Sequence, residues 1–118
     1  PNTAKGFTGR AMNEEIHVSA FKGQTAALKR LIKAGCDVNR ANVNGETPAL
    51  FAASSGQTAA LEILVKASCD VNQAMLDGRT PSYVAAEKGQ TAVLEILVKA
   101  GCDVNQAKKD GVTPAYIA

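Results

Sequence analysis

The chain has 118 residues, enough for one domain of modest size, and its net charge of +2 is too small to indicate a nucleic-acid or membrane-surface partner. Hydrophobic residues make up 46% of the chain but aromatic residues only 4%, so a core would be built from small aliphatic side chains. No apolar run is long enough for a transmembrane helix.

The sequence repeats with a fixed period. KAGCDVN at 33–39 returns as KASCDVN at 66–72 and as KAGCDVN at 99–105, 33 residues apart each time. Residues 44–76 and 77–109 are identical at 22 of 33 aligned positions and differ at the other 11. Because such periods indicate repeat architectures, we expect one domain with five parts. These are a lead (1–10), a capping repeat (11–43), repeat 2 (44–76), repeat 3 (77–109) and the start of a truncated repeat 4 (110–118).

The first repeat differs from the others in a directed way. Its first helix opens as NEEIHVS, which predicts Asn13 as N-cap, followed by two acidic residues at the positive helix end. Arg30 stands where Ile63 and Ile96 stand in the later repeats. A cation there indicates a face that no preceding repeat covers, so we interpret residues 11–43 as an N-terminal cap.

Repeat 3 shows the local grammar most clearly. DGRTPSYVAAEKG at 77–89 opens with an Asp-Gly turn; Thr80 is the predicted N-cap and Pro81 the first helical residue. A glycine ends this helix, and Thr91 is the predicted cap of a second helix whose leucines and valine share one face. Gly101 suits the left-handed position after that helix. Ser68 replaces it in repeat 2, at a cost of about 1 kcal/mol.

Two short helices cannot bury their apolar faces alone, whereas stacked copies can. We therefore predict an all-α fold, an elongated α-solenoid of stacked helix–turn–helix repeats with no β-sheet beyond the turn fingers between them. Paired alanines, such as Ala85 and Ala86, allow neighbouring helices to approach closely.

The recurring cysteines Cys36, Cys69 and Cys102 admit four readings: a disulfide ladder, a metal site, nucleophiles or packing. Stacked helices lie about 8–10 Å apart, too far for Cα atoms that a disulfide needs within about 7 Å. No CxxC pair is present for zinc, and no base is apparent beside a cysteine. We expect the three cysteines to be small buried residues, and we expect no metal and no cofactor. The adjoining aspartates are expected to bond turn amides. Three reduced thiols favour an intracellular, cytoplasmic location.

The unit DGRTPSYVAA–KGQTAVLEILVKAGCDVN resembles the ankyrin repeat, whose usual pattern is close to DGxTPLHxAAxxGHxEVVxLLLxxGADVN, over residues 11–118. The resemblance implies helix–turn–helix units joined by protruding β-turn fingers, and binding of another protein. Leu50, Tyr83 and Tyr116 replace the family histidine, and His17 keeps it in a structural role. The resemblance also gives structural roles in turns to the Asn residues of the DVN segments. In some arrays of the family these asparagines are hydroxylated. The family's Ala before Asp is Cys in all three repeats.

Phosphate-binding loops, HExxH and GxSxG motifs are missing, so we predict a non-catalytic protein-interaction module, monomeric, with no nucleic-acid or membrane partner. The alternative is a regulatory segment of a larger enzyme, channel or secreted bacterial effector, which the full-length sequence would distinguish.

The resemblance places partner contacts at the finger tips and at the exposed end of each first helix. The matching residues are Phe21, Lys22, Val43, Asn44, Glu46, Ser54, Ser55, Leu76, Asp77, Arg79, Glu87, Lys88, Lys109, Asp110 and Val112. Nine of the 11 positions that differ between repeats 2 and 3 fall in the finger or first helix, which predicts one variable surface on a fixed scaffold. We expect an apolar anchor near Phe21, Val43 and Leu76, with Arg79 and Lys88 pairing with acidic partner residues.

Overall fold

The computed structural model describes residues 12–102, and side chains from residue 15 onward. This part of the chain consists of helices, turns and loops, with no strand. The all-α stacked fold expected from the repeat is thereby confirmed. Its six helices are α2 (Met12–Lys22), α3 (Thr25–Lys33), α4 (Pro48–Ser55), α5 (Thr58–Lys66), α6 (Pro81–Glu87) and α7 (Thr91–Lys99).

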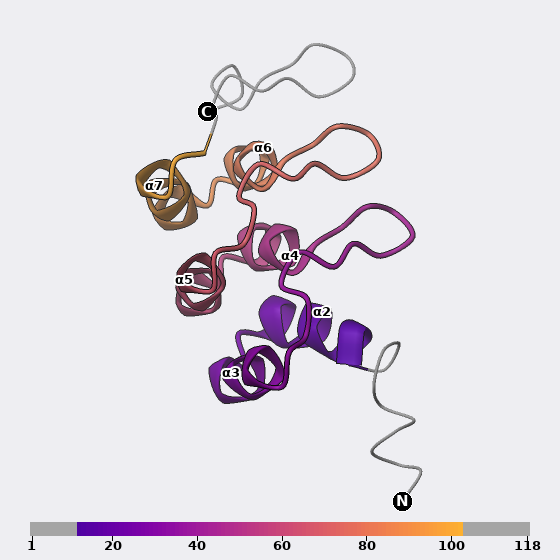
Figure 1. The fold of residues 1–118 in the computed structure, drawn as a ribbon. Coiled ribbons are helices and arrows are strands. Elements are labelled where there is room, and N and C mark those ends of the chain that lie inside the picture. The colour runs from indigo at the N-terminus through magenta and orange to yellow at the C-terminus, as the bar shows by residue number, and fades with distance from the viewer. Residues whose placement is uncertain (1–11, 103–118) are drawn as a thin grey trace, which may run out of the picture.

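The helices form two layers, shown end-on in Figure 1. The first helices of the repeats, α2, α4 and α6, lie in one layer, and the second helices, α3, α5 and α7, lie in the other. Long loops before α4 and α6 project on the side away from the second helices (Figure 1). We call residues 42–46 the first finger and residues 75–79 the second finger.

Threonine and proline start the first helices of repeats 2 and 3, α4 and α6, as predicted. The Oγ1 atom of Thr47 accepts a hydrogen bond from the Leu50 amide at 3.2 Å, and that of Thr80 accepts one from the Tyr83 amide at 3.1 Å. In each case proline follows as the first helical residue, where its missing N–H has no cost. A left-handed glycine follows α4, Gly56 with φ of 72°.

The second helices begin differently from the prediction. Thr91 lies inside α7, and Gln90 occupies the N-cap position without a side-chain capping bond. Gln57 does the same before α5. Their carboxamides reach the preceding repeat instead: the Nε2 atom of Gln57 donates to the Phe21 carbonyl at 3.2 Å, and that of Gln90 donates to the Ser54 carbonyl at 3.3 Å. Each glutamine therefore links two repeats at the end of a first helix.

The start of the first repeat also differs from the prediction. Helix α2 begins at Met12, so Asn13 is already helical and is not the N-cap. Helix α2 has 11 residues, against 8 in α4 and 7 in α6. Arg30 is exposed, while Ile63 and Ile96 at the matching positions are half-buried against the core. The role of residues 11–43 as a capping repeat stays a prediction.

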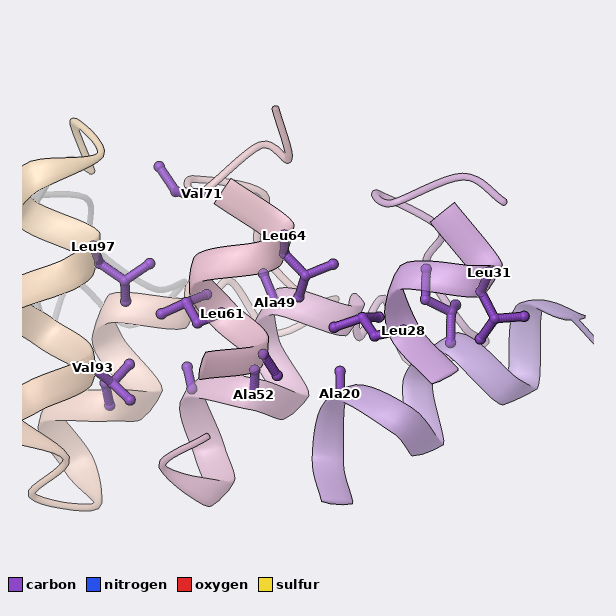
Figure 2. Close-up of a cluster of buried hydrophobic side chains, with 14 residues drawn as sticks. Ala20, Leu28, Leu31, Ala49, Ala52, Leu61, Leu64, Val71, Val93 and Leu97 are labelled. Carbon is purple, nitrogen blue, oxygen red and sulfur yellow. The ribbon is translucent and has the colours of Figure 1, made fainter. Parts of the chain in front are cut away.

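The core lies between the two layers. Figure 2 shows Leu28, Leu61, Leu64 and Leu97 of the second helices in one cluster with Ala20, Ala49 and Ala52 of the first helices. These leucines are completely buried, and each contributes about 1.5–3 kcal/mol relative to an exposed side chain. Alanines at the facing positions let the helices approach closely, which explains how a nearly aromatic-free chain fills its core. The stack is elongated, 51 × 25 × 20 Å.

Candidate functional site

The two fingers are held by closely spaced turn hydrogen bonds. In the first finger the Asn42 side chain accepts from the Asn44 and Glu46 amides at 3.0 and 2.9 Å and donates to the Glu46 carboxylate at 2.8 Å. In the second finger Asp77 accepts from the Arg79 amide at 3.0 Å. The Leu76 amide donates to the Asn44 carbonyl at 3.0 Å and joins the two fingers. The fingers therefore present their side chains from an ordered backbone.

His17 supports the first finger from α2. Its Nε2 atom lies 2.8 Å from the Arg40 carbonyl oxygen and 3.0 Å from that of Glu46. Both partners are acceptors, so Nε2 carries the proton and donates to both. The ring is buried, with 8% of its surface exposed. These contacts agree with the structural role that the resemblance implied for this histidine. At the matching positions of the later repeats Leu50 and Tyr83 are buried.

Arg79 ties the second finger to the end of α6. Its Nε atom lies 2.8 Å from the Asp77 carboxylate and its Nη1 atom 3.0 Å from the Glu87 carboxylate. Burial lowers the pKa of Arg79, but the hydrogen bonds and charges of these two carboxylates outweigh it and raise the pKa overall. Each half-exposed pair is worth about 0.2–1 kcal/mol. Arg79 thus already has two acidic partners within its own repeat, and its pairing with acidic residues of a partner protein stays a prediction.

Phe21 borders a depression of about 230 Å³, together with His17, Val18, Lys22 and Phe51. The rings of Phe21 and Phe51 meet edge-to-face with centroids 6.1 Å apart. Phe21 therefore has a packing partner in the next repeat, which the sequence did not indicate. Val43 and Leu76, 90% and 62% exposed, lie on the fingers and are not part of this lining.

The remaining predicted contact residues lie on the surface to different degrees. Lys22, Asn44, Asp77, Glu87 and Lys88 are exposed. Glu46, Ser54, Ser55 and Arg79 are half-buried. Lys109, Asp110 and Val112 fall outside the described residues. We call the twelve described residues of this predicted set the finger face.

The variation between repeats 2 and 3 is not purely a surface feature. Ala49 and Leu50 differ from Ser82 and Tyr83 in repeat 3, yet all four are buried. These changes adjust packing between the layers, so the prediction that one exposed surface collects the variation is wrong for them. At 44, 46, 54 and 55, and at 75 and 76, the differing side chains are exposed or half-buried.

The cysteines lie beside the core, half-buried and in no disulfide among the described residues, and are thus less buried than predicted. Burial, followed by the charge of Asp37, raises the pKa of Cys36, and burial, followed by the charge of Asp70, raises that of Cys69 to about 11. A raised pKa keeps these thiols protonated and poor as nucleophiles at neutral pH. Each aspartate accepts from an amide two residues on, Asp37 from Asn39 and Asp70 from Asn72, both at 2.9 Å.

Asn39 joins successive repeats. Its side-chain oxygen accepts from the Asp70 amide at 2.7 Å, and its carbonyl accepts from the Gln73 side chain at 3.2 Å. The turn role implied by the resemblance therefore extends across the boundary between repeats.

A second surface lies between the second helices. A depression of about 550 Å³ runs between α5 and α7 beside Glu62, Lys66, Glu95 and Lys99. These exposed side chains are identical in the two repeats. Nowhere in the described part of the chain do three or more His, Cys, Asp or Glu side chains gather as metal ligands would. Of the helices within residues 12–102, none is both long and apolar enough to cross a membrane.

The repeat architecture, the fingers and the glycine-terminated helices define the class of protein. A family model for ankyrin repeats, in three copies, matches residues 16–118, and the chain belongs to the ankyrin repeat family. Ankyrin repeats are in general protein–protein interaction modules and are typically non-catalytic. Comparison with curated proteins gives no match.

Proposed function

We propose that this chain is a non-catalytic interaction module, a monomer that binds a partner protein through the concave finger face. The observation that supports the proposal is a contrast between two exposed surfaces. On the finger face Asn44 and Ser54 give way to Asp77 and Glu87 one repeat later. On the second-helix surface Glu62 and Lys66 recur unchanged as Glu95 and Lys99, although they are exposed.

The finger face also suits binding physically. Its backbone is fixed by Asn42, His17 and the hydrogen bond between the fingers, so little loop order is lost on association. Two large apolar side chains, Val43 and Leu76, project from the fingers into solvent. Single exposed apolar residues are common, but neighbours on a rigid surface are typical of an interface.

The proposed setting is the reducing interior of the cell, because Cys36 and Cys69 form no disulfide among the described residues and burial raises the pKa of both thiols. Thiol titration of the unfolded, unreduced protein should find three free groups. Fewer than three would contradict this setting.

The partner is to be isolated by affinity capture on the full chain, identified by mass spectrometry and purified for binding measurements. Leu76→Asp is the test variant, since Leu76 is 62% exposed and its side chain is outside the core. Val98→Asp is the matched control, because Val98 is 54% exposed but lies on α7. Leu76→Asp should weaken binding by about 1–2 kcal/mol. Loss of binding in the control alone would move the site to the second helices.

A further inference from the structure

The aromatic depression at the N-terminal end of the finger face belongs to no repeated feature of the fold. The positions that match Val18, Phe21 and Lys22 one repeat later are Phe51, Ser54 and Ser55. The residue that would replace Phe51 as the floor is Val84, which is 3% exposed. Since the stacking recurs while these side chains do not, repeat packing alone does not account for them.

We propose that this depression receives one apolar side chain of the partner protein, carried beside an acidic residue that pairs with Lys22. The proposal rests on the proposed function and assigns chemistry to one part of the finger face. The lining surface is apolar and comes from two neighbouring first helices, α2 and α4.

Size favours a protein side chain over a small-molecule ligand. Pockets for drug-sized ligands and cofactors usually measure about 300–1,000 Å³. The depression measures about 230 Å³ and is open to solvent, which is room for a single side chain. Burial of one leucine- or phenylalanine-sized group there would contribute on the scale of an interface hot spot.

The walls are already in position. The imidazole of His17 is fixed by two carbonyl groups, and the ring of Phe51 stands edge-on against it with centroids 5.5 Å apart at 86°. Phe21 then packs edge-on against Phe51 at 89°. Because each ring is braced by the next, few side-chain rotations remain to be frozen on binding. Val18 and Phe21 are nevertheless 46% and 48% exposed, so apolar surface is left uncovered.

The charge of Lys22 at the rim of the depression favours an acidic residue beside the apolar side chain of the partner. Lys22 is exposed, in the last turn of α2, and takes part in neither of the ion pairs among the described residues, both of which belong to Arg79. A carboxylate on the partner would pair with it and speed association. The chain's own Phe7 is a poor candidate by charge, because it is flanked by Lys5 and Arg10.

The test uses a phage-displayed library of random short peptides, selected on the full chain. Recovered peptides should carry an apolar residue close to Asp or Glu. Val18→Glu should lower their affinity by at least about tenfold, whereas Val98→Glu, the same change at a similarly exposed valine of α7, should change it less than about twofold. Thermal unfolding of both variants checks that each remains folded.

A second pair of variants tests the charge. Lys22→Glu should weaken the acidic peptides by at least about tenfold at low salt, and Lys99→Glu, also in the last turn of a helix, should not. Peptides whose acid is replaced by its amide should lose this sensitivity to Lys22→Glu. Equal affinity of acidic and amide peptides would overturn the acidic half of the proposal.

Other outcomes overturn the proposal in distinguishable ways. Peptides that ignore Val18→Glu but respond to Leu76→Asp would remove the depression and leave the finger face standing as the binding site. Peptides whose affinity changes only in Glu62→Lys would overturn both the depression and the finger face as binding sites. A selection that recovers no binding peptide would also count against both sites. Tighter peptide binding in Phe7→Ala would assign the depression to the chain's own lead. Self-association lost in Val18→Glu would assign it to a second copy.

Discussion

Ser68 is the one described non-glycine residue with a positive φ, 66°. It occupies the position after α5 that Gly35 and Gly101 occupy in the other repeats, where φ is 94° and 89°. The left-handed backbone costs a residue with a Cβ atom about 1–2 kcal/mol. A glycine in its place relieves this strain, but it also gives the unfolded chain more conformational freedom, which offsets about 0.4–1 kcal/mol of the gain. Ser68→Gly should therefore raise the free energy of unfolding by about 0.5–1 kcal/mol.

The reverse change provides the matched control. A Cβ atom added at Gly35 would meet nothing within 4 Å, so Gly35→Ser tests backbone conformation alone. It should lower the free energy of unfolding by about 0.5–1 kcal/mol, and the double variant should return close to the starting stability. Ser68→Ala keeps the Cβ and removes the hydroxyl, and should stay within about 0.5 kcal/mol of the parent.

Urea unfolding followed by far-ultraviolet circular dichroism measures these differences, with the slope on denaturant unchanged if only native strain is altered. The Ser68 side chain is exposed and its hydroxyl makes no hydrogen bond to the described residues. A less stable Ser68→Gly would mean that the side chain, not the backbone, determines the energetics of this position, and the strain argument would fail.

Three further changes probe the caps, the fingers and the thiols. Thr80→Ala removes a buried N-cap whose hydroxyl also hydrogen-bonds Ser82 at 3.1 Å, and should lower the free energy of unfolding in urea by about 1–2 kcal/mol. Thr91→Ala, inside α7, should lower it by less than about 0.5 kcal/mol. Equal losses would refute the assigned helix starts. Gly45→Ala would bring a Cβ within 2.7 Å of the Leu76 amide nitrogen and should cost more than about 2 kcal/mol, unlike Gly101→Ala, where the space is open. Because the pKa of Cys69 rises from 9.0 to about 11 on folding, only the unfolded chain ionises between those values, so stability is intact below pH 9 and falls through this window. After discounting for solvent screening, the free energy of unfolding falls by about 1–2 kcal/mol, and the fall should be smaller in Cys69→Ala. The same dependence of stability on alkaline pH in both proteins would contradict the burial of this thiol.

Much of the fold could be predicted because it depends on local chemistry repeated at a fixed spacing. Thr80 and Pro81 specify a helix start within three residues, and the glycines at equivalent positions indicate that Ser68 is strained. The second-helix starts could not be predicted by the same rule, because threonine is a common cap and glutamine is not. The recurring GQT of all three repeats was the available signal for Gln57 and Gln90.

The candidate site could be predicted only in part, because a repeat pattern gives equivalent positions but not contacts between them. Arg79 and Glu87 are eight residues apart, on a finger and at a helix end, and their pairing depends on how the finger folds back. The contact of Phe21 with Phe51 depends likewise on the stacking of two repeats. The variation at Ala49 and Leu50 could not be recognised as core packing, because sequence difference alone does not reveal burial.

The central claim is that a partner protein binds the finger face and leaves the second helices uncovered. Amide hydrogen exchange of the chain, free and in complex with its captured partner, tests this most directly. We expect slower exchange on complex formation at the fingers, residues 42–46 and 75–79, and at the C-terminal ends of α2, α4 and α6, with α5 and α7 unchanged. Slowing confined to α5 and α7 would contradict the account.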